Sequence, residues 1–271
     1  MLFYKRFSEG PEKEKIMTVE LKKLVDHLDH LLEPEPIEDV AVNGLQVPGG
    51  EFVHKVAVST DATMDVFQEA IARQCDFLFV HHGIFWNYNR EDRITYRKKE
   101  ILELLFNNKL ALYASHCPLD IHPDYGNNRG VFDLLGLENP QTMGHYRGRD
   151  LGLMGVPEEG QVSLETLVQR LEVGIGDKVK VLAFHDEPVR KVAIITGQGQ
   201  FGLKEAETRG FDTFITGEIN HYVFHEAKEL KTNVILAGHY RSETLGPRAI
   251  GAHLQKKFDL PWEFLDFPTG L

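Results

Sequence analysis

The sequence is short of cysteine, with only Cys75 and Cys117 among 271 residues. Two thiols outside a CxxC pair cannot build a disulfide framework, so a reducing compartment is expected. The sequence also lacks an apolar run long enough to cross a membrane. Its first residues, MLFYKRFSEGPEKEK, show neither the apolar core nor the small-residue cleavage site of a secretory signal. We therefore expect a soluble, cytoplasmic protein with no membrane partner.

Basic residues are in the minority, because 30 Lys and Arg face 41 Asp and Glu for a formal net charge of −11. Proteins that bind nucleic-acid phosphates usually carry a basic face, so nucleic acid is not expected as a partner, although a local basic patch could lie within an acidic total. The hydrophobic fraction of 42% is ordinary for a globular protein. A chain of this length can bury a core as one large domain or as two intertwined ones.

Strand-like and helix-like segments alternate along the chain. Residues 1–16 are polar and charged, so we expect an N-terminal extension that can be disordered, with the globular part starting near Met17. The strand-like segments of the first half are 54–60, 77–80 and 110–115, and the helix-like segments are 64–74 and 96–108. The second half repeats this rhythm. The alternation predicts an α/β fold with mixed, largely parallel sheets flanked by helices.

The two halves also match residue by residue. Shifted by 136 positions, the segment from Lys55 lies without a gap on the segment from Lys191, with eight identical residues. A shift of 123 then places ASHCPLD (114–120) on AGHYRSE (237–243). Any two β-α-β units resemble each other to some degree, but the second match favours an internal duplication. We predict two similar α/β halves, at 17–140 and 141–271.

Imidazole and carboxylate side chains follow several of the predicted strands. They are His81 and His82 after 77–80, Asp120 after 110–115, Glu218 after 211–215, and His239 with Glu243 after 233–237. In a parallel α/β sheet the loops at the carboxyl ends of the strands form the ligand crevice. Imidazoles with carboxylates are the ligand set of first-row transition metals. The sequence therefore predicts a metal site at these strand ends.

The adjacent histidines suggest two ions. Neighbouring residues on extended backbone point to opposite sides, so one imidazole per metal is the easier geometry for His81 and His82. Glu243 has two oxygens and could bridge the two ions, while His239 and Asp120 complete the separate coordination spheres. In GHYRSETLGPRAI a helix is expected to start near Ser242, with Glu243 on its first turn and His239 on the preceding loop.

Structural roles compete with this interpretation. One histidine of the pair could be a core imidazole and the other a surface residue. Asp120 could be a turn residue, with Asn127 or Asn128 as the N-cap of a helix, and His239 and Glu243 could be a loop contact and a helix-dipole carboxylate. Two further sets of histidines lie near the predicted ligands in sequence. His116 and His122 flank Asp120 and suit an outer-sphere or acid-base role. His221 and His225, four residues apart, could share a helix face and chelate a metal, or they could lie on a wet helix face beside the site.

The chain contains, in this order, VNGLQV at 42–47, HHG followed by an aromatic residue, SHCPLD, TGE and GHYRSETLG. In this combination of motifs it resembles the Nif-three-like proteins, also called GTP cyclohydrolase type 2 homologs. The resemblance covers the chain from Met17, a candidate for the true start, to the C-terminus. It implies one domain of two similar, intertwined α/β subdomains, a ring-like homohexamer and a dinuclear metal centre. It also implies that His82 and Asp120 hold one metal, His81 and His239 the other, and Glu243 both.

A bridged pair of ions suits hydrolysis, so the leading hypothesis is a metal-dependent hydrolase with two divalent transition-metal ions per chain. The ligand chemistry does not distinguish Zn, Fe, Mn, Co or Ni. The substrate would be small and polar or nucleotide-like, in a GTP cyclohydrolase-like or phosphoesterase-like reaction, although no Walker-type loop is present. The alternatives are a non-enzymatic metal carrier or regulatory scaffold with protein partners, and an α/β domain whose histidines are structural.

Overall fold

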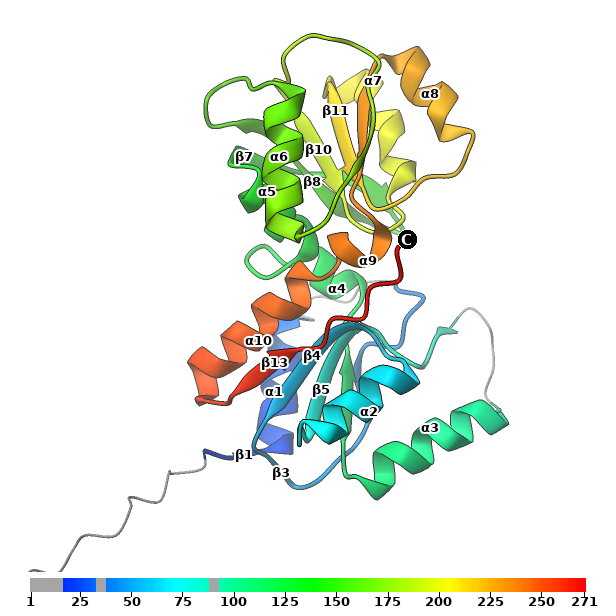
Figure 1. The fold of residues 1–271 in the computed structure, drawn as a ribbon, viewed down its shortest axis with the longest axis vertical. Helices are drawn as coiled ribbons and strands as arrows, with labels where there is room; N and C mark the ends of the chain where they lie inside the picture. Colours follow the sequence, from blue (N-terminus) through cyan, green and yellow to red (C-terminus); the bar gives the residue numbers. More distant parts are fainter. Residues whose placement is uncertain (1–16, 33–37, 88–92) are drawn as a thin grey trace, which may run out of the picture.

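The computed structural model describes residues 17–32, 38–87 and 93–271. It contains two α/β units, one above the other in Figure 1, and the C-terminal segment runs between them. The predicted extension at 1–16 lies outside the described residues. Within the described ranges no helix combines the length and the apolar character that a membrane span needs.

The first sheet has the strand order β13-β4-β5-β6-β2. Its strands are β2 (Gly44–Val47), β4 (Val56–Asp61), β5 (Phe77–His82), β6 (Ala111–Ala114) and β13 (Trp262–Phe264). The first four in the order are parallel, and β2 runs antiparallel along the edge. A short antiparallel pair, β1 (Val19–Glu20) with β3 (Phe52–Val53), lies beside it. The three inner strands β4, β5 and β6 have apolar residues on both faces, which requires helices on both sides.

Helices cover both faces of this sheet. They are α1 (Leu21–Leu32) and α10 (Leu245–Phe258) on one face, and α2 (Met64–Ala72) and α3 (Tyr96–Asn107) on the other. Alternate residues of one strand serve the two faces, because Phe77 and Phe79 pack in the core with α1 whereas Leu78 and Val80 pack with α2.

The second sheet has the order β7-β8-β10-β11-β12-β9. Its strands are β7 (Leu137–Tyr146), β8 (Arg149–Pro157), β9 (Lys180–Leu182), β10 (Val192–Ile195), β11 (Thr213–Thr216) and β12 (Asn233–Leu236). Only β10, β11 and β12 are parallel to one another, and β7, β8 and β9 join antiparallel. The prediction of largely parallel sheets is therefore wrong for this sheet, because the long hairpin of β7 and β8 was not recognised in the sequence.

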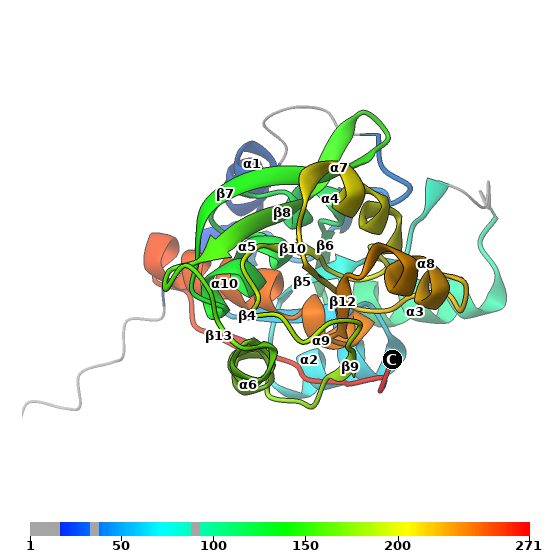
Figure 2. The same cartoon turned by 90° about the horizontal axis from the view of Figure 1, so that it is seen from above.

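Figure 2 shows the second sheet from above, with helices on both of its faces. They are α5 (Asn127–Leu134) and α6 (Leu164–Ile175) on one side, and the 3-10 helix η2 (Gln200–Glu205), α7 (Ala206–Arg209) and α8 (Val223–Leu230) on the other. Two further helices, α4 (Cys117–Asp120) and α9 (His239–Ser242), are single turns at the junction of the two units.

Each core takes segments from both sides of residue 140. Val131 and Phe132 of α5 pack in the core of the second sheet. Ile250 and Leu254 of α10 pack in the core of the first sheet, and the C-terminal strand β13 pairs with β4. The chain thus crosses from the first unit to the second and returns. The division into halves at 17–140 and 141–271 stays a prediction.

Residues that match between the halves make matching contacts. The carboxylate of Asp76 accepts hydrogen bonds from the backbone N–H groups of His54 and Lys55, and the carboxylate of Asp212 accepts them from Arg190 and Lys191. The ammonium of Lys55 donates to the carbonyl of Arg73, as that of Lys191 donates to the carbonyl of Arg209. Such paired contacts are what a duplication predicts, and the duplication itself stays a prediction.

The elements predicted in the first half are confirmed to within two residues at each end. In the second half, the helix predicted to start near Ser242 begins elsewhere. His239 opens the single turn α9, Glu243 caps its C-terminal end, and α10 begins only at Leu245 with Pro247 in its first turn. Because a second helix starts directly after α9, Glu243 lies at a bend between two helices and its side chain can point into the junction.

Candidate metal centre

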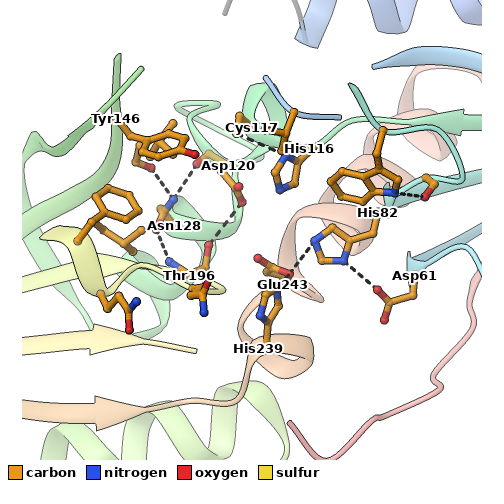
Figure 3. A pocket seen from close by; sticks show the side chains of 18 of the residues that line it. Asp61, His82, His116, Cys117, Asp120, Asn128, Tyr146, Thr196, His239 and Glu243 are labelled. Carbon is orange, nitrogen blue, oxygen red and sulfur yellow. Dashed lines mark hydrogen bonds and ion pairs between the residues drawn. The ribbon is translucent and has the colours of Figure 1, made fainter. Parts of the chain in front are cut away.

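Five of the predicted side chains come together at the junction of the two units, and Figure 3 shows four of them, His82, Asp120, His239 and Glu243. His81 and His82 are the last two residues of β5, Asp120 ends α4, His239 begins α9, and Glu243 follows α9. They form two overlapping groups whose possible ligand atoms lie within 4.8 Å of one another, and Glu243 belongs to both.

The first group surrounds Oε1 of Glu243. Nε2 of His81 lies 3.6 Å from this oxygen and 3.5 Å from Oδ1 of Asp120. The side chain of His81 is fully buried and that of Glu243 is 4% exposed. Asn127 and Thr196 donate hydrogen bonds to Asp120 at 2.9 and 3.4 Å, and these bonds fix the direction of its carboxylate.

The second group surrounds Oε2 of Glu243, which lies 3.3 Å from Nε2 of His82 and 3.2 Å from Nε2 of His239. Ligand atoms at bonds of about 2.1 Å in a tetrahedral arrangement lie about 3.4 Å apart, so both groups have the spacing that a divalent ion requires. In addition, Nε2 of His81 and Oε2 of Glu243 are buried without a hydrogen bond. Each group therefore contains one buried polar atom without a hydrogen bond, Nε2 of His81 in the first and Oε2 of Glu243 in the second, and a bound metal would supply the missing interaction.

The Nδ1 atom of each of these three histidines is held by an oxygen on the far side of the ring. The partners are the carbonyl of Ser115 for His81 at 2.9 Å, Asp61 for His82 at 2.8 Å and Glu218 for His239 at 2.9 Å. A hydrogen bond at Nδ1 places the proton there and leaves the Nε2 lone pair free for a metal. Asp61 is in reach because the parallel register of β4 and β5 sets it beside His82.

Without a metal, the centre holds protons instead. Burial alone would lower the pKa of His81, but the charges of Asp120 and Glu243 outweigh it and raise this pKa to about 10. Burial also opposes protonation of His239, yet Glu243 and Glu218 raise its pKa to about 9. Burial would raise the pKa of Glu243, but His82 and His81 hold it well below the usual range. The site is therefore built for cations.

The contacts pair the ligands differently from the resemblance. His81 lies with Asp120, and His82 lies with His239, whereas the resemblance implied the opposite partners for the two histidines. The ligand pairing implied by the resemblance stays a prediction, whereas the expectation that the adjacent histidines face away from each other is wrong, because their ring centroids are only 4.6 Å apart. His82 ends β5, so its side chain can turn towards the same carboxylate. Each of the two groups around Glu243 nevertheless contains only one histidine of this adjacent pair.

Gly197 keeps Glu243 in place from the opposite side. Its φ of +63° lies in the left-handed region, and a Cβ at this position would collide with Oε1 of Glu243. Only glycine allows the backbone after β10 to approach the carboxylate of Glu243 this closely. Gly197 and Asp61 were not predicted as site residues. Both follow or end a strand, so the rule that selected Asp120 could have found them.

A cavity of about 800 Å³ opens over the centre. Its lining includes His82, Asp120, His239, Glu243 and His116, together with aromatic side chains from both units. The aromatic residues are Trp86, Tyr146, Phe201 and Tyr222. A cavity of this size above a possible metal pair can hold a small molecule.

The remaining histidine candidates do not reach the centre. His122 accepts hydrogen bonds from the backbone N–H groups of Asp124 and Tyr125, and is not part of a ligand group. His221 and His225 lie edge to face at 5.9 Å, also outside these groups.

The two asparagines after Asp120 are not N-caps, because Gly126 precedes α5 in that position. Instead the amide of Asn127 donates to the carboxylate of Asp120, and the amide of Asn128 donates to its carbonyl at 3.1 Å. Both asparagines therefore help to fix Asp120 in the junction.

Fold and site together define the class of this protein: an α/β protein of two units with a buried cluster of histidines and carboxylates between them. Residues 19–269 match the family described as Duf34/NIF3 (NGG1p interacting factor 3), and the chain belongs to this family.

Its relatives include two archaeal proteins named "GTP cyclohydrolase 1 type 2 homolog". The one from Pyrococcus abyssi is 37% identical over 256 residues, which cover 93% of this chain and 100% of that protein. The one from Archaeoglobus fulgidus is 39% identical over 251 residues, with 93% and 99% covered. Among solved structures, TTHA1606 from Thermus thermophilus is similar with a TM-score of 0.82 and 38% identity, over 93% of this chain and all of that one. The resemblance inferred from the four motifs is confirmed at the level of the family.

Proposed function

We propose that this protein is a metal-dependent hydrolase that uses two divalent transition-metal ions per chain. The position of Glu243 carries the proposal, since each of its oxygens faces a separate set of ligands, one with His81 and Asp120 and one with His82 and His239. A carboxylate shared in this way is typical of two-metal hydrolytic sites. When bound, two such ions lower the pKa of a water molecule and polarise the bond under attack.

The residues of the chain would hold and orient these ions. Asp61 and Glu218 fix the rings of His82 and His239, and Asn127 fixes Asp120, so the ligand atoms are arranged before a metal arrives. The buried position of His81 and Glu243 keeps bulk water from the inner side of the centre. The open side faces the cavity, where a substrate would lie against the ions.

The lining of the cavity favours a small polar substrate. None of the described residues that line it is Lys or Arg, and three of them, Asp61, Asp120 and Glu243, are carboxylates. The distal phosphates of a nucleoside triphosphate would find no cationic side chain among these residues. We therefore place phosphodiesters and cyclic amides ahead of GTP as substrates, although relatives carry the name GTP cyclohydrolase 1 type 2 homolog.

The test combines metal content with turnover. Protein purified without chelator should contain about two transition-metal equivalents per chain and hydrolyse bis(p-nitrophenyl) phosphate, and Glu243→Gln should lose both properties. A protein that binds two ions and cleaves neither this probe, nor cyclic amides, nor GTP would instead be a metal carrier or scaffold. Asp61 and Glu218 would orient the histidines of a metal carrier in the same way, so only turnover separates these two functions.

Two further expectations go with this proposal. A homohexamer, implied by the resemblance, would place several such centres in one particle, and light scattering on the purified protein measures its mass directly. A location in the cytoplasm stays a prediction from composition, which fractionation of cells that express the protein would test.

A further inference from the structure

The segment VNGLQV and the residues before it hold one side of the metal centre. Asn43 accepts a hydrogen bond from the backbone N–H of His116 at 2.8 Å. Gln46 accepts one from the N–H of Ile84 at 2.8 Å, and its amide lies so close to Gly83 that a Cβ there would collide with it. This segment therefore positions both the loop after His82 and the residue His116.

Asp39, four residues before Asn43, makes the most extensive contacts with His116 and the residues around it. Its side chain is 3% exposed, and both of its oxygens are fully occupied. Oδ1 accepts hydrogen bonds from Nδ1 of His116 at 2.8 Å and the N–H of Ala41 at 3.0 Å, and Oδ2 accepts from Asn43 and the N–H of Cys117, each at 3.0 Å. A carboxylate with four donors has no lone pair left for a metal. Asp39 thus serves His116.

The hydrogen bond to Asp39 determines which nitrogen of His116 is available. With the proton on Nδ1, the free nitrogen is Nε2. His116 lines the cavity, its side chain is 19% exposed, and Figure 3 shows its ring between Asp120 and His82. One ring nitrogen lies within 4.8 Å of a nitrogen of His81 and of His82. His116 thus forms a further possible ligand group with His81 and His82, outside the two groups around Glu243.

A comparison with Asp61 and His82 shows what is distinct about this pair. Both pairs join a carboxylate to Nδ1 of a histidine at 2.8 Å. Nε2 of His82 faces Glu243 at 3.3 Å and can bind a metal there. No carboxylate of the described residues forms an ion pair with Nε2 of His116, so among these residues no anionic side chain holds this nitrogen.

We propose that His116 is the acid-base residue of the centre and that Asp39 is its positioning residue. This step rests on the proposed hydrolase function. Nε2 of His116 takes a proton from the attacking water as its oxygen bonds to the phosphorus or carbonyl carbon of the substrate. The bond to the leaving group then breaks, and Nε2 returns the proton to the leaving atom, so His116 ends the cycle as it began.

The experiment compares the two carboxylate and histidine pairs on the metal-loaded protein, with bis(p-nitrophenyl) phosphate as the probe. His116→Gln should keep about two ions per chain and lose about 10²-fold or more in kcat, together with one limb of the pH profile. Asp39→Asn should keep both ions and lose about 10- to 100-fold in kcat. The matched control Asp61→Asn should instead lose about 10- to 100-fold in metal affinity at one position.

Several results would overturn the proposal. Loss of metal from His116→Gln would make His116 a ligand, and an unchanged pH profile in this variant would remove the acid-base role. Asp39→Asn alone cannot decide, because an amide facing the N–H donors could prevent folding, and His116→Gln does not share this risk.

A readout without turnover separates this proposal from the hydrolase function. The ¹⁵N shifts of His116 in the zinc-loaded protein should show a proton on Nδ1 and a free Nε2 in alkaline buffer, and Asp39→Asn should abolish this preference. A zinc-bound or protonated Nε2 refutes the pair even if turnover is found. If the protein shows the predicted shifts but cleaves no probe, the hydrolase function and its catalytic step are refuted. The pairing of His116 with Asp39 as a positioned base in the cavity then still stands.

Discussion

Paired ligand substitutions should empty the two metal positions one at a time. The structure sets His82 with His239 and His81 with Asp120, each pair on its own oxygen of Glu243. The double variant His82→Gln with His239→Gln removes two ligands from one position and none from the other. It should therefore keep about one ion per chain, whereas His81→Gln with His239→Gln removes one ligand from each position and should weaken both.

The thermal shift follows from linkage. An ion at about one hundred times its Kd stabilises the folded chain by about 2.7 kcal/mol. For a chain of this size, 1 kcal/mol moves Tm by about 2 to 4 °C, so each bound ion should add about 5 to 10 °C. Wild type should gain this amount twice when metal is added to the stripped protein. The variant without His82 and His239 should gain it once.

Elemental analysis and thermal unfolding, each with and without added Zn²⁺, measure both quantities. Comparing each variant with its own metal-free form removes the effect of the substitutions on the fold. If the variant without His82 and His239 loses both ions while the one without His81 and His239 keeps one, the ligands pair as the resemblance implied, and the geometry derived from the contacts is wrong.

Three further outcomes follow from the site and the fold. Metal binding should release protons at neutral pH and should tighten from about pH 6 to about pH 8, because carboxylates raise the pKa of His81 to about 10 and of His239 to about 9 in the metal-free site. Calorimetry in buffers of different ionisation enthalpy measures the number of protons released. Metal binding without proton release would contradict this prediction. Gly197→Ala should lose metal through collision with the carboxylate of Glu243, whereas Gly210→Ala, with a similar φ but open space around it, should keep its ions. Equal metal content in both variants rejects the steric cause. Leu254→Ala should cost about 2 to 5 kcal/mol in urea unfolding because α10 completes the first core; a cost near zero would place α10 outside it.

The sequence predicted the parts of the site that lie at strand ends. The apolar strand 77–80 and the alternation with helices located His81 and His82 at the end of β5, and the same rule located Asp120, His239 and Glu243. The hypothesis that Glu243 bridges two ions came from its two oxygens, and it stays a prediction. These inferences need only local pattern and the topology of parallel sheets.

The partners of these residues needed the tertiary structure. Asp39 precedes no recognisable strand, and its four hydrogen bonds join it to residues up to 78 positions away. Only the later VNGLQV motif gave a signal in this region, and it pointed to no chemistry. The return of β13 to pair with β4 was likewise not visible, because a three-residue strand at the end of a chain has little periodicity.

The most direct test of the bridged centre is anomalous diffraction from crystals of the metal-loaded protein. Two peaks about 3.5 to 4 Å apart should flank Glu243, one beside His81 and Asp120 and the other beside His82 and His239. A single peak, or two peaks that do not share Glu243, would contradict the dinuclear centre.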